Sequence, residues 1–137
     1  ERSPPHMDPI VHFELPVTDL QQARDFYAPI FGWKLQDWPM PDGSTMVGVH
    51  TTPIDETTRQ PLKPGAINGG IILKNDKVQM PVFAVHVASI DERVAQMEAK
   101  GATVVMPKTD MMGMGFYCYV KDPFGNVIGL WQDPPKA

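Results

Sequence analysis

The sequence predicts an α+β fold built from one β-α-β-β-β unit that occurs twice. The first observation is an alternating strand near the N-terminus, in which Phe13, Leu15 and Val17 are separated by polar or small positions. The second is that the same alternation returns over residues 82–87. The third is that a helix signal follows each of these strands. Together they indicate an internal duplication.

The helix signals lie at equivalent places in the two halves. Asp19 can cap a helix, with Gln22 three positions later, and Ser89 can do the same with Glu92. Pro29 lies inside the first predicted helix, where it removes a backbone hydrogen bond, so we expect a kink or an early end there.

The remaining elements follow from apolar runs and turn residues. The first unit is predicted to contain strands over 11–17, 33–37, 45–51 and 66–73, with a helix over 19–31. The second is predicted to contain strands over 81–87, 103–106, 115–121 and 126–132, with a helix over 89–100. We therefore divide the chain into an N-terminal tail (1–9), a first unit (10–74), a second unit (81–132) and a C-terminal tail (133–137), the two units forming one domain.

Composition excludes several classes of function. The chain has 137 residues and a net charge of −4, with 12 scattered basic residues, which argues against a nucleic-acid surface. No apolar run approaches the roughly 20 residues of a membrane span. Cys118 is the single cysteine, so no intrachain disulfide is expected, and no activating neighbour suggests a nucleophile.

The N-terminal tail is polar and proline-rich, unlike a signal peptide. We therefore expect a cytoplasmic protein. Met7 is a candidate native start, and we expect residues 1–6 to be a remnant of expression.

Several motifs resemble the vicinal oxygen chelate superfamily, which includes glyoxalase I, bleomycin-resistance proteins and extradiol dioxygenases. The opening unit of that superfamily is similar to His12-x-x-Leu15-x-Val17-x-Asp19, followed by Phe26-Tyr27 and Phe31-Gly32-Trp33. The run from Asp122 to Trp131 looks like its closing strand. The stretches His-Phe-Glu, Asn-Gly-Gly, Val-Met-Pro-Lys and Gly-Asn-Val-Ile-Gly-Leu-Trp resemble most strongly the group described as related to lactoylglutathione lyase. The resemblance covers about residues 10–132.

This resemblance implies that the two units curl into an open barrel, with the helices outside and a cavity at the centre. It also implies four metal-ligand positions, one on the first and one on the last strand of each unit. His12 matches the first position. The second falls near Gly69 or Gly70, the third on Val82 and the fourth, usually Glu, on Gly129. We expect no family-type metal site, since His12 is the single matching ligand. The alternative is a divalent metal (Zn, Ni, Mn or Fe) held by ligands placed elsewhere.

Alternation places His12 and Glu14 on the cavity face, with Cβ atoms roughly 6.5–7 Å apart. They are the candidate catalytic residues, acting as acid and base on a small substrate, and a neighbouring carboxylate would favour a protonated imidazole. The alternative is that both are satisfied polar residues of the cavity wall. His86 shares their face but lies about 13 Å along its strand from the third metal position.

Three further residues complete the predicted ligand cavity, namely Asn68, His86 and Trp131. The Trp131 ring either stacks on a flat ligand or fills space left by glycines. Tyr117 and Tyr119 share one side of a strand whose orientation the sequence leaves open. A methionine cluster at a Gly-rich turn could mould the rim, comprising Met106, Met111, Met112 and Met114.

Two functional classes follow. The first is a module that binds a small organic molecule, much as bleomycin-resistance members do. The second is an enzyme, either a lyase or isomerase using His12 and Glu14, or a metalloenzyme of the glyoxalase or dioxygenase type. We favour binding without a family-type metal. The expected partners are a small-molecule ligand and a second copy in a homodimer, with neither nucleic acid nor membrane.

Overall fold

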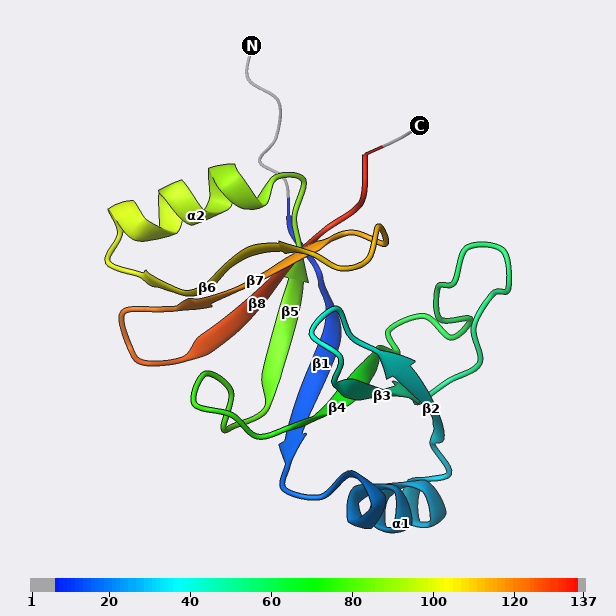
Figure 1. The fold of residues 1–137 in the computed structure, drawn as a ribbon. Coiled ribbons are helices and arrows are strands. Elements are labelled where there is room, and N and C mark those ends of the chain that lie inside the picture. The colour runs from blue at the N-terminus through cyan, green and yellow to red at the C-terminus, as the bar shows by residue number, and fades with distance from the viewer. Residues whose placement is uncertain (1–6, 136–137) are drawn as a thin grey trace.

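A single curled sheet of eight strands organises the computed structural model, which describes residues 7–135 (Figure 1). Two helices accompany it, α1 (Leu20–Phe31) and α2 (Ile90–Ala99). The strands are β1 (Ile10–Val17), β2 (Lys34–Pro39), β3 (Thr45–His50), β4 (Asn68–Leu73), β5 (Val82–His86), β6 (Thr103–Asp110), β7 (Phe116–Lys121) and β8 (Val127–Gln132). The predicted fold of two β-α-β-β-β units with an open, curled sheet is confirmed. The remnant expected at residues 1–6 lies outside the described residues, as does the end of the C-terminal tail.

The two units meet along one seam at the centre of the sheet. The strand order is β2-β3-β4-β1-β5-β8-β7-β6, so each unit contributes four neighbouring strands. At the seam β1 and β5 run antiparallel, with His12 opposite Ala84 and Glu14 opposite Val82. Within each unit, the first and last strands pair in parallel. The units therefore join each other within this chain.

Local sequence signals explain the helix boundaries. The side chain of Asp19 accepts a hydrogen bond from the Gln22 backbone, and that of Ser89 accepts one from Glu92, as the capping pattern predicts. α1 nevertheless continues past Pro29 to Phe31, so the expected early end is wrong. Pro29 lies in the last turn, and Gly32 closes the helix in a left-handed conformation.

The strand β6 is longer than its sequence suggests. It extends to Asp110, past the predicted end at residue 106, and thus contains Pro107. β6 lies at the edge of the sheet and its pairing with β7 shifts register around this point. An edge strand tolerates proline at such an irregularity because a missing N–H costs no ladder bond there.

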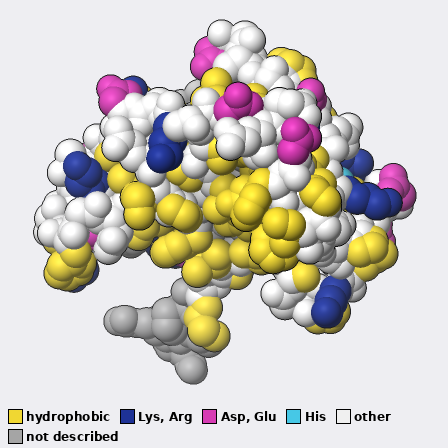
Figure 2. Space-filling model, turned by 90° about the horizontal axis from the view of Figure 1, so that it is seen from below, with side chains coloured by type: hydrophobic (Ala, Val, Ile, Leu, Met, Phe, Trp, Pro, Cys, Tyr) yellow, Lys and Arg dark blue, Asp and Glu magenta, His cyan; other side chains and the backbone are white. Residues whose placement is uncertain are grey.

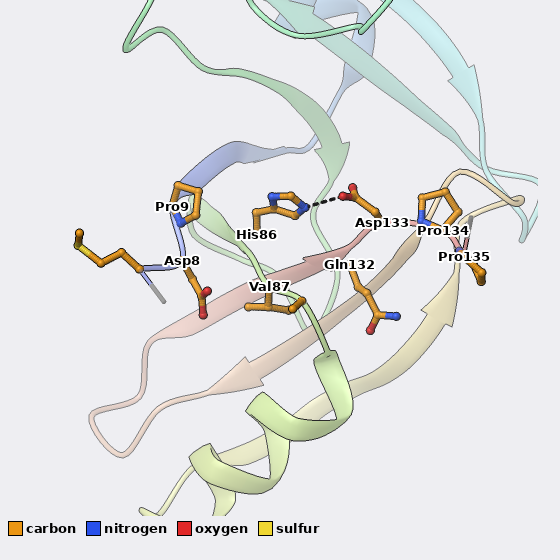
Figure 3. Close-up of a pocket in the computed structure, with 10 residues that line it drawn as sticks. Asp8, Pro9, His86, Val87, Gln132, Asp133, Pro134 and Pro135 are labelled. Atoms are coloured by element: carbon orange, nitrogen blue, oxygen red, sulfur yellow. Dashed lines mark hydrogen bonds and ion pairs between the residues drawn. The ribbon is translucent and has the colours of Figure 1, made fainter. Parts of the chain in front are cut away.

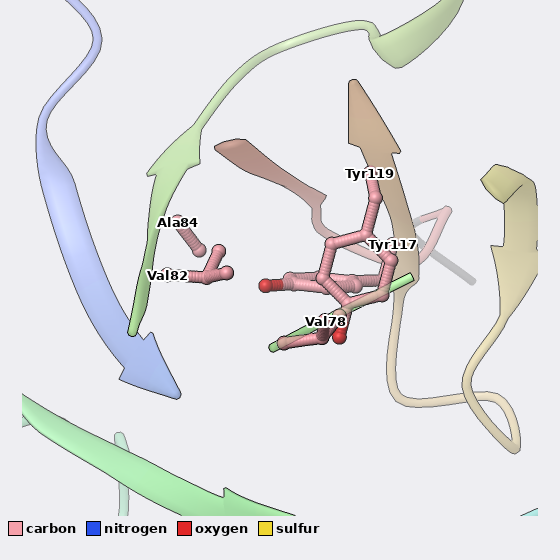
Figure 4. Packing of buried hydrophobic residues seen from close by; sticks show 5 residues of the cluster. All are labelled: Val78, Val82, Ala84, Tyr117 and Tyr119. Carbon is pink, nitrogen blue, oxygen red and sulfur yellow. The ribbon is translucent and has the colours of Figure 1, made fainter. Parts of the chain in front are cut away.

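The sheet has two distinct faces. On the outer face, α1 covers a cluster around Val47, Val49 and Ile71, and α2 covers another around Val120 and Leu130. We call the opposite face the inner face. Its central cluster comprises Val78, Val82, Ala84, Tyr117 and Tyr119 (Figure 4).

Glycines on the inner face make room for large side chains from neighbouring strands. A Cβ on Gly129 would fall on the Tyr117 hydroxyl, and one on Gly70 would meet the Met46 sulfur. Glycine inside a strand often marks a place where another group approaches the backbone closely. The side chains of Tyr117 and Met46 therefore pack over these glycines on the inner face.

No helix among the described residues is long and apolar enough to cross a membrane.

Candidate functional site

The candidate site is centred on Glu14, in the middle of the inner face. Glu14 projects from β1 and only 6% of the residue is exposed. Its Oε1 accepts hydrogen bonds from the hydroxyls of Tyr119 at 2.6 Å and Tyr117 at 3.2 Å. Both tyrosines project from β7 into the cluster that they form with Val78, Val82 and Ala84 (Figure 4). A carboxyl of the first unit is therefore bound by two phenols of the second.

His12 lies beside this group, one pleat further along β1. Its ring is edge-on to that of Tyr117, with centroids 6.5 Å apart. The side chain is partly buried, and neither ring nitrogen has a hydrogen-bond partner among the described residues. Since no fully enclosed side-chain nitrogen or oxygen in that part of the chain lacks a partner, these nitrogens reach the surface of the inner face.

Burial dominates the electrostatics of this site. It lowers the pKa of His12 to about 4, because an apolar setting disfavours imidazolium. Burial also raises the pKa of Glu14 and outweighs the two phenol hydrogen bonds, which lower it. The pKa values of both tyrosines are raised by burial first and by the charge of Glu14 second. The expectation that Glu14 favours a protonated His12 is therefore wrong, because desolvation outweighs that attraction.

The residues present do not fit a metal of the family type. The fourth ligand position, Gly129, has its side-chain space taken by the Tyr117 hydroxyl, and the third, Val82, belongs to the apolar cluster. At the second, Gly70 lies beneath Met46. Within residues 7–135, no group of three or more His, Cys, Asp or Glu side chains is arranged to hold a metal ion.

Asn68 lies on the inner face directly beside His12 in the β1–β4 register. Its Oδ1 accepts hydrogen bonds from the backbone N–H groups of Thr51 and Thr52. The amide oxygen thus fastens the chain after β3 to the start of β4. Only the amide nitrogen remains for a ligand.

His86 lies in a separate hollow of about 600 Å³ at the end of the sheet (Figure 3). Its Nε2 is 3.0 Å from Asp133 Oδ2, and the hollow is formed by residues 7–9, 86–88 and 132–135. Neither His12 nor Glu14 lines it. The structure therefore does not bring His86 to the candidate site.

Trp131 lies on the inner face, between Tyr117 of the candidate site and Asp133 of the hollow that holds His86. Its ring centroid is 6.4 Å from that of Tyr117, and its Nε1 donates to Asp133. The indole also covers Gly115, where a Cβ would collide with it. Of the rim methionines, Met106 and Met111 pack on the central cluster, whereas Met112 and Met114 are exposed. Cys118 is fully buried and its thiol pKa is raised to about 11 by burial, which makes it a poor nucleophile.

Tyr117 and Tyr119 are the functional candidates whose orientation the sequence analysis leaves open. The turn after Lys121 places that residue opposite Val127, which sets Tyr119 opposite Gly129. Because the resemblance puts Gly129 at a metal-ligand position of the cavity, this register alone identifies the face of both tyrosines. The signal was present in the turn length.

Comparison with known proteins places this arrangement in a family. Residues 9–130 match the family described as the Glyoxalase/Bleomycin resistance protein/Dioxygenase superfamily. A Mycobacterium bovis protein named "Putative glyoxylase CFP32" is 30% identical over 122 residues, which are 87% of this chain and 43% of that protein. The anthracycline biosynthesis protein DauV of a Streptomyces species is 27% identical, over 88% of this chain and 45% of its own. The chain thus spans less than half the length of these relatives.

Solved structures share the fold at low sequence identity. The hypothetical protein BH1468 of Bacillus halodurans superposes with a TM-score of 0.67 at 13% identity, over 96% of this chain and 99% of its own. The methylmalonyl-CoA epimerase of Mycobacterium tuberculosis gives 0.59 at 16%, over 92% and 88%. The Mn(II)-bound glyoxalase of Novosphingobium aromaticivorans gives 0.60 at 17%, over 92% of this chain but 38% of that one.

Proposed function

The chain belongs to the glyoxalase/bleomycin resistance protein/dioxygenase superfamily, and we propose that within it the protein binds a small organic molecule on the inner face of its sheet. The proposal includes no metal held in the family manner. One observation carries it: a buried carboxyl, bound by two tyrosines, lies in an apolar setting beside a histidine whose nitrogens are free. A few oriented polar groups on an otherwise apolar surface are typical of ligand sites.

The donor set supports binding without the metal. Three of the four ligand positions that the resemblance implies are glycine or valine in this chain, and the space beside one of them is filled by a tyrosine. Divalent metals require several His or carboxylate donors in one place. His12 alone does not provide them.

A second candidate function is acid–base catalysis at the same site. The observation in its favour is that His12 is neutral at pH 7, while burial raises the pKa of Glu14. His12 would accept a proton from a bound substrate, and protonated Glu14 would donate one to a developing oxyanion. Perturbed pKa values of this kind cluster at functional sites.

The first experiment combines elemental analysis with a ligand screen. Protein purified without chelator is compared with the variant His12→Ala, and we expect no stoichiometric Zn, Ni, Mn or Fe in either. Compounds that raise the melting temperature of the wild type are then tested on His12→Ala and on the surface control Lys77→Ala. Loss of the shift in His12→Ala alone supports the inner-face site. A stoichiometric metal that disappears in His12→Ala would overturn the metal-free proposal.

The same compounds separate binding from catalysis. Each is incubated with wild type and with His12→Ala, and its NMR spectrum is followed over time. A compound converted by the wild type alone assigns the protein to the enzymes. A compound that binds and stays unchanged assigns it to the binding modules.

A further inference from the structure

The carboxyl of Glu14 uses only one of its two oxygens within the protein. Both phenol hydroxyls donate to Oε1, and Oε2 has no partner among residues 7–135. In that same part of the chain no fully enclosed side-chain oxygen lacks a partner, so Oε2 retains contact with the surface. A strong hydrogen-bond acceptor thus remains open in a residue that is otherwise buried.

The protein supplies no positive charge to this carboxyl. The described residues form four ion pairs, namely Arg24–Asp37, His86–Asp133, Arg93–Asp8 and Lys108–Asp91. Glu14 takes part in none of them. His12 is its titratable neighbour on the same strand, and burial keeps that imidazole neutral. A buried carboxylate without a cation is costly, and the raised pKa of Glu14 expresses this cost.

Aromatic rings gather around Tyr117, one of the two residues that donate to this carboxyl. Tyr117 and Tyr119 meet edge to face with centroids 5.1 Å apart, and the rings of His12 and Trp131 lie 6.5 and 6.4 Å from that of Tyr117. The hydroxyl protons of both tyrosines are already directed at Glu14, so their oxygens offer acceptors to a ligand. Aromatic faces attract cations. The Glu14 carboxyl, the tyrosine oxygens and the aromatic rings therefore all favour a positively charged hydrogen-bond donor.

We propose that the inner face selects small organic cations with a planar body, such as amidinium, guanidinium or aryl-ammonium compounds. The ligand's N–H groups donate to Oε2 of Glu14, and its flat body lies against the aromatic rings. This inference rests on the proposed binding function and names the class of ligand. A carboxylate ligand would face Glu14 with like charge, and a neutral amide would leave the carboxylate without a counter-charge.

Three probes of nearly the same shape and different charge test this inference, namely benzamidinium, benzamide and benzoate. Each is titrated into wild-type protein at pH 8, where Glu14 is more fully ionised, and dissociation constants are read from NMR chemical shifts. We expect benzamidinium to bind at least tenfold more tightly than benzamide, with benzoate weakest. The shifts should include residues 12, 14, 117 and 119. Glu14→Gln should abolish the preference, whereas Asp91→Asn, which removes one surface carboxylate, should retain it.

The outcomes distinguish the class of ligand from the binding function itself. If benzamide shifts the same resonances with equal affinity, the inference of a cationic ligand is overturned and binding at the inner face stands. If none of the probes shifts these resonances, the inference of a planar cationic ligand is overturned, and the thermal-shift screen with His12→Ala and Lys77→Ala decides the binding function separately. Should Glu14→Gln fail to fold, the comparison of the three probes on wild type and Asp91→Asn decides.

Discussion

His12 shows how one buried side chain links the site to stability. Burial lowers its pKa from an ordinary value of 6.5 to about 4. Between these two pH values His12 is protonated in the unfolded chain and stays neutral in the folded protein. Stability from this residue is therefore fully present above pH 6.5 and is lost as the pH falls toward 4.

The variant His12→Gln tests this linkage. We expect the wild type to lose about 2 kcal/mol of unfolding free energy between pH 7 and pH 4.5 because of His12, at about 1.4 kcal/mol per pKa unit and less for a partly buried ring. Urea unfolding at several pH values measures it. Glu14 acts in the opposite sense in both proteins, since its raised pKa favours the folded state at low pH. The difference between the two proteins therefore isolates His12, and parallel pH profiles would contradict the assignment.

Gly129 and Gly70 provide a matched pair of inner-face substitutions. Gly129→Ala would place a methyl group on the Tyr117 hydroxyl, which Glu14 holds in place, so we expect a loss of about 2–3 kcal/mol. Gly70→Ala meets the flexible end of Met46, so a loss below about 1 kcal/mol is expected. Chemical denaturation measures both. Equal losses would show that Tyr117 moves as freely as Met46.

The two helices depend on their N-caps to similar degrees. Asp19 accepts from Gln22 at 2.9 Å and Ser89 accepts from Glu92 at 3.1 Å. Asp19→Ala and Ser89→Ala should each cost about 1 kcal/mol, the usual value of a lost cap. Thermal unfolding of each variant checks this, with Thr57→Ala as a control on an exposed loop. A cap variant that melts with the wild type would show that packing against the sheet alone holds that helix.

At this scale the sequence predicts most elements, because their signals are local. The alternation over 11–17 and the caps at Asp19 and Ser89 agree with the structure. The errors arise at prolines. Pro29 removes one backbone hydrogen bond without ending α1, and Pro107 is tolerated in β6 because that strand lies at the edge of the sheet.

The candidate site is less accessible to sequence reasoning, because its contacts join distant parts of the chain. Alternation correctly places His12 and Glu14 on the face away from α1. The partners of Glu14, however, lie more than 100 residues away, and their orientation follows from the register of β7 and β8. The electrostatic balance at His12 requires burial, which the sequence does not give.

The whole molecule exposes a large apolar surface on one side. Figure 2 shows hydrophobic side chains gathered on the face that carries α1 in Figure 1. On α1 itself, Phe31 is 57% exposed and Ile30 is 59% exposed, and Phe26 is exposed beside them. Apolar patches of this kind are commonly covered by another protein surface. A second copy of the chain is the partner that the sequence analysis expects.

A double variant tests this homodimer. We expect the wild type to sediment as a dimer and Ile30→Ser with Phe31→Ser to sediment as a monomer, since the change removes two exposed apolar anchors. Leu62→Ser is the matched control, because Leu62 is 59% exposed on the loop between β3 and β4. Analytical ultracentrifugation at micromolar concentration provides the measurement. A monomeric wild type, or a control that dissociates equally, would count against α1 as the interface.

The seam at the centre of the sheet also determines when β1 can pair with its neighbours during synthesis. β1 is made first, yet its partners are β4, which pairs residue 12 with residue 68, and β5, which pairs it with residue 84. At about 5–20 residues per second, the strand that carries His12 and Glu14 emerges several seconds before its second neighbour. Both of its edges are open to any extended chain nearby until β4 is made, and one edge stays open until β5 follows. The centre of the finished molecule is thus its most exposed part while the protein is being made.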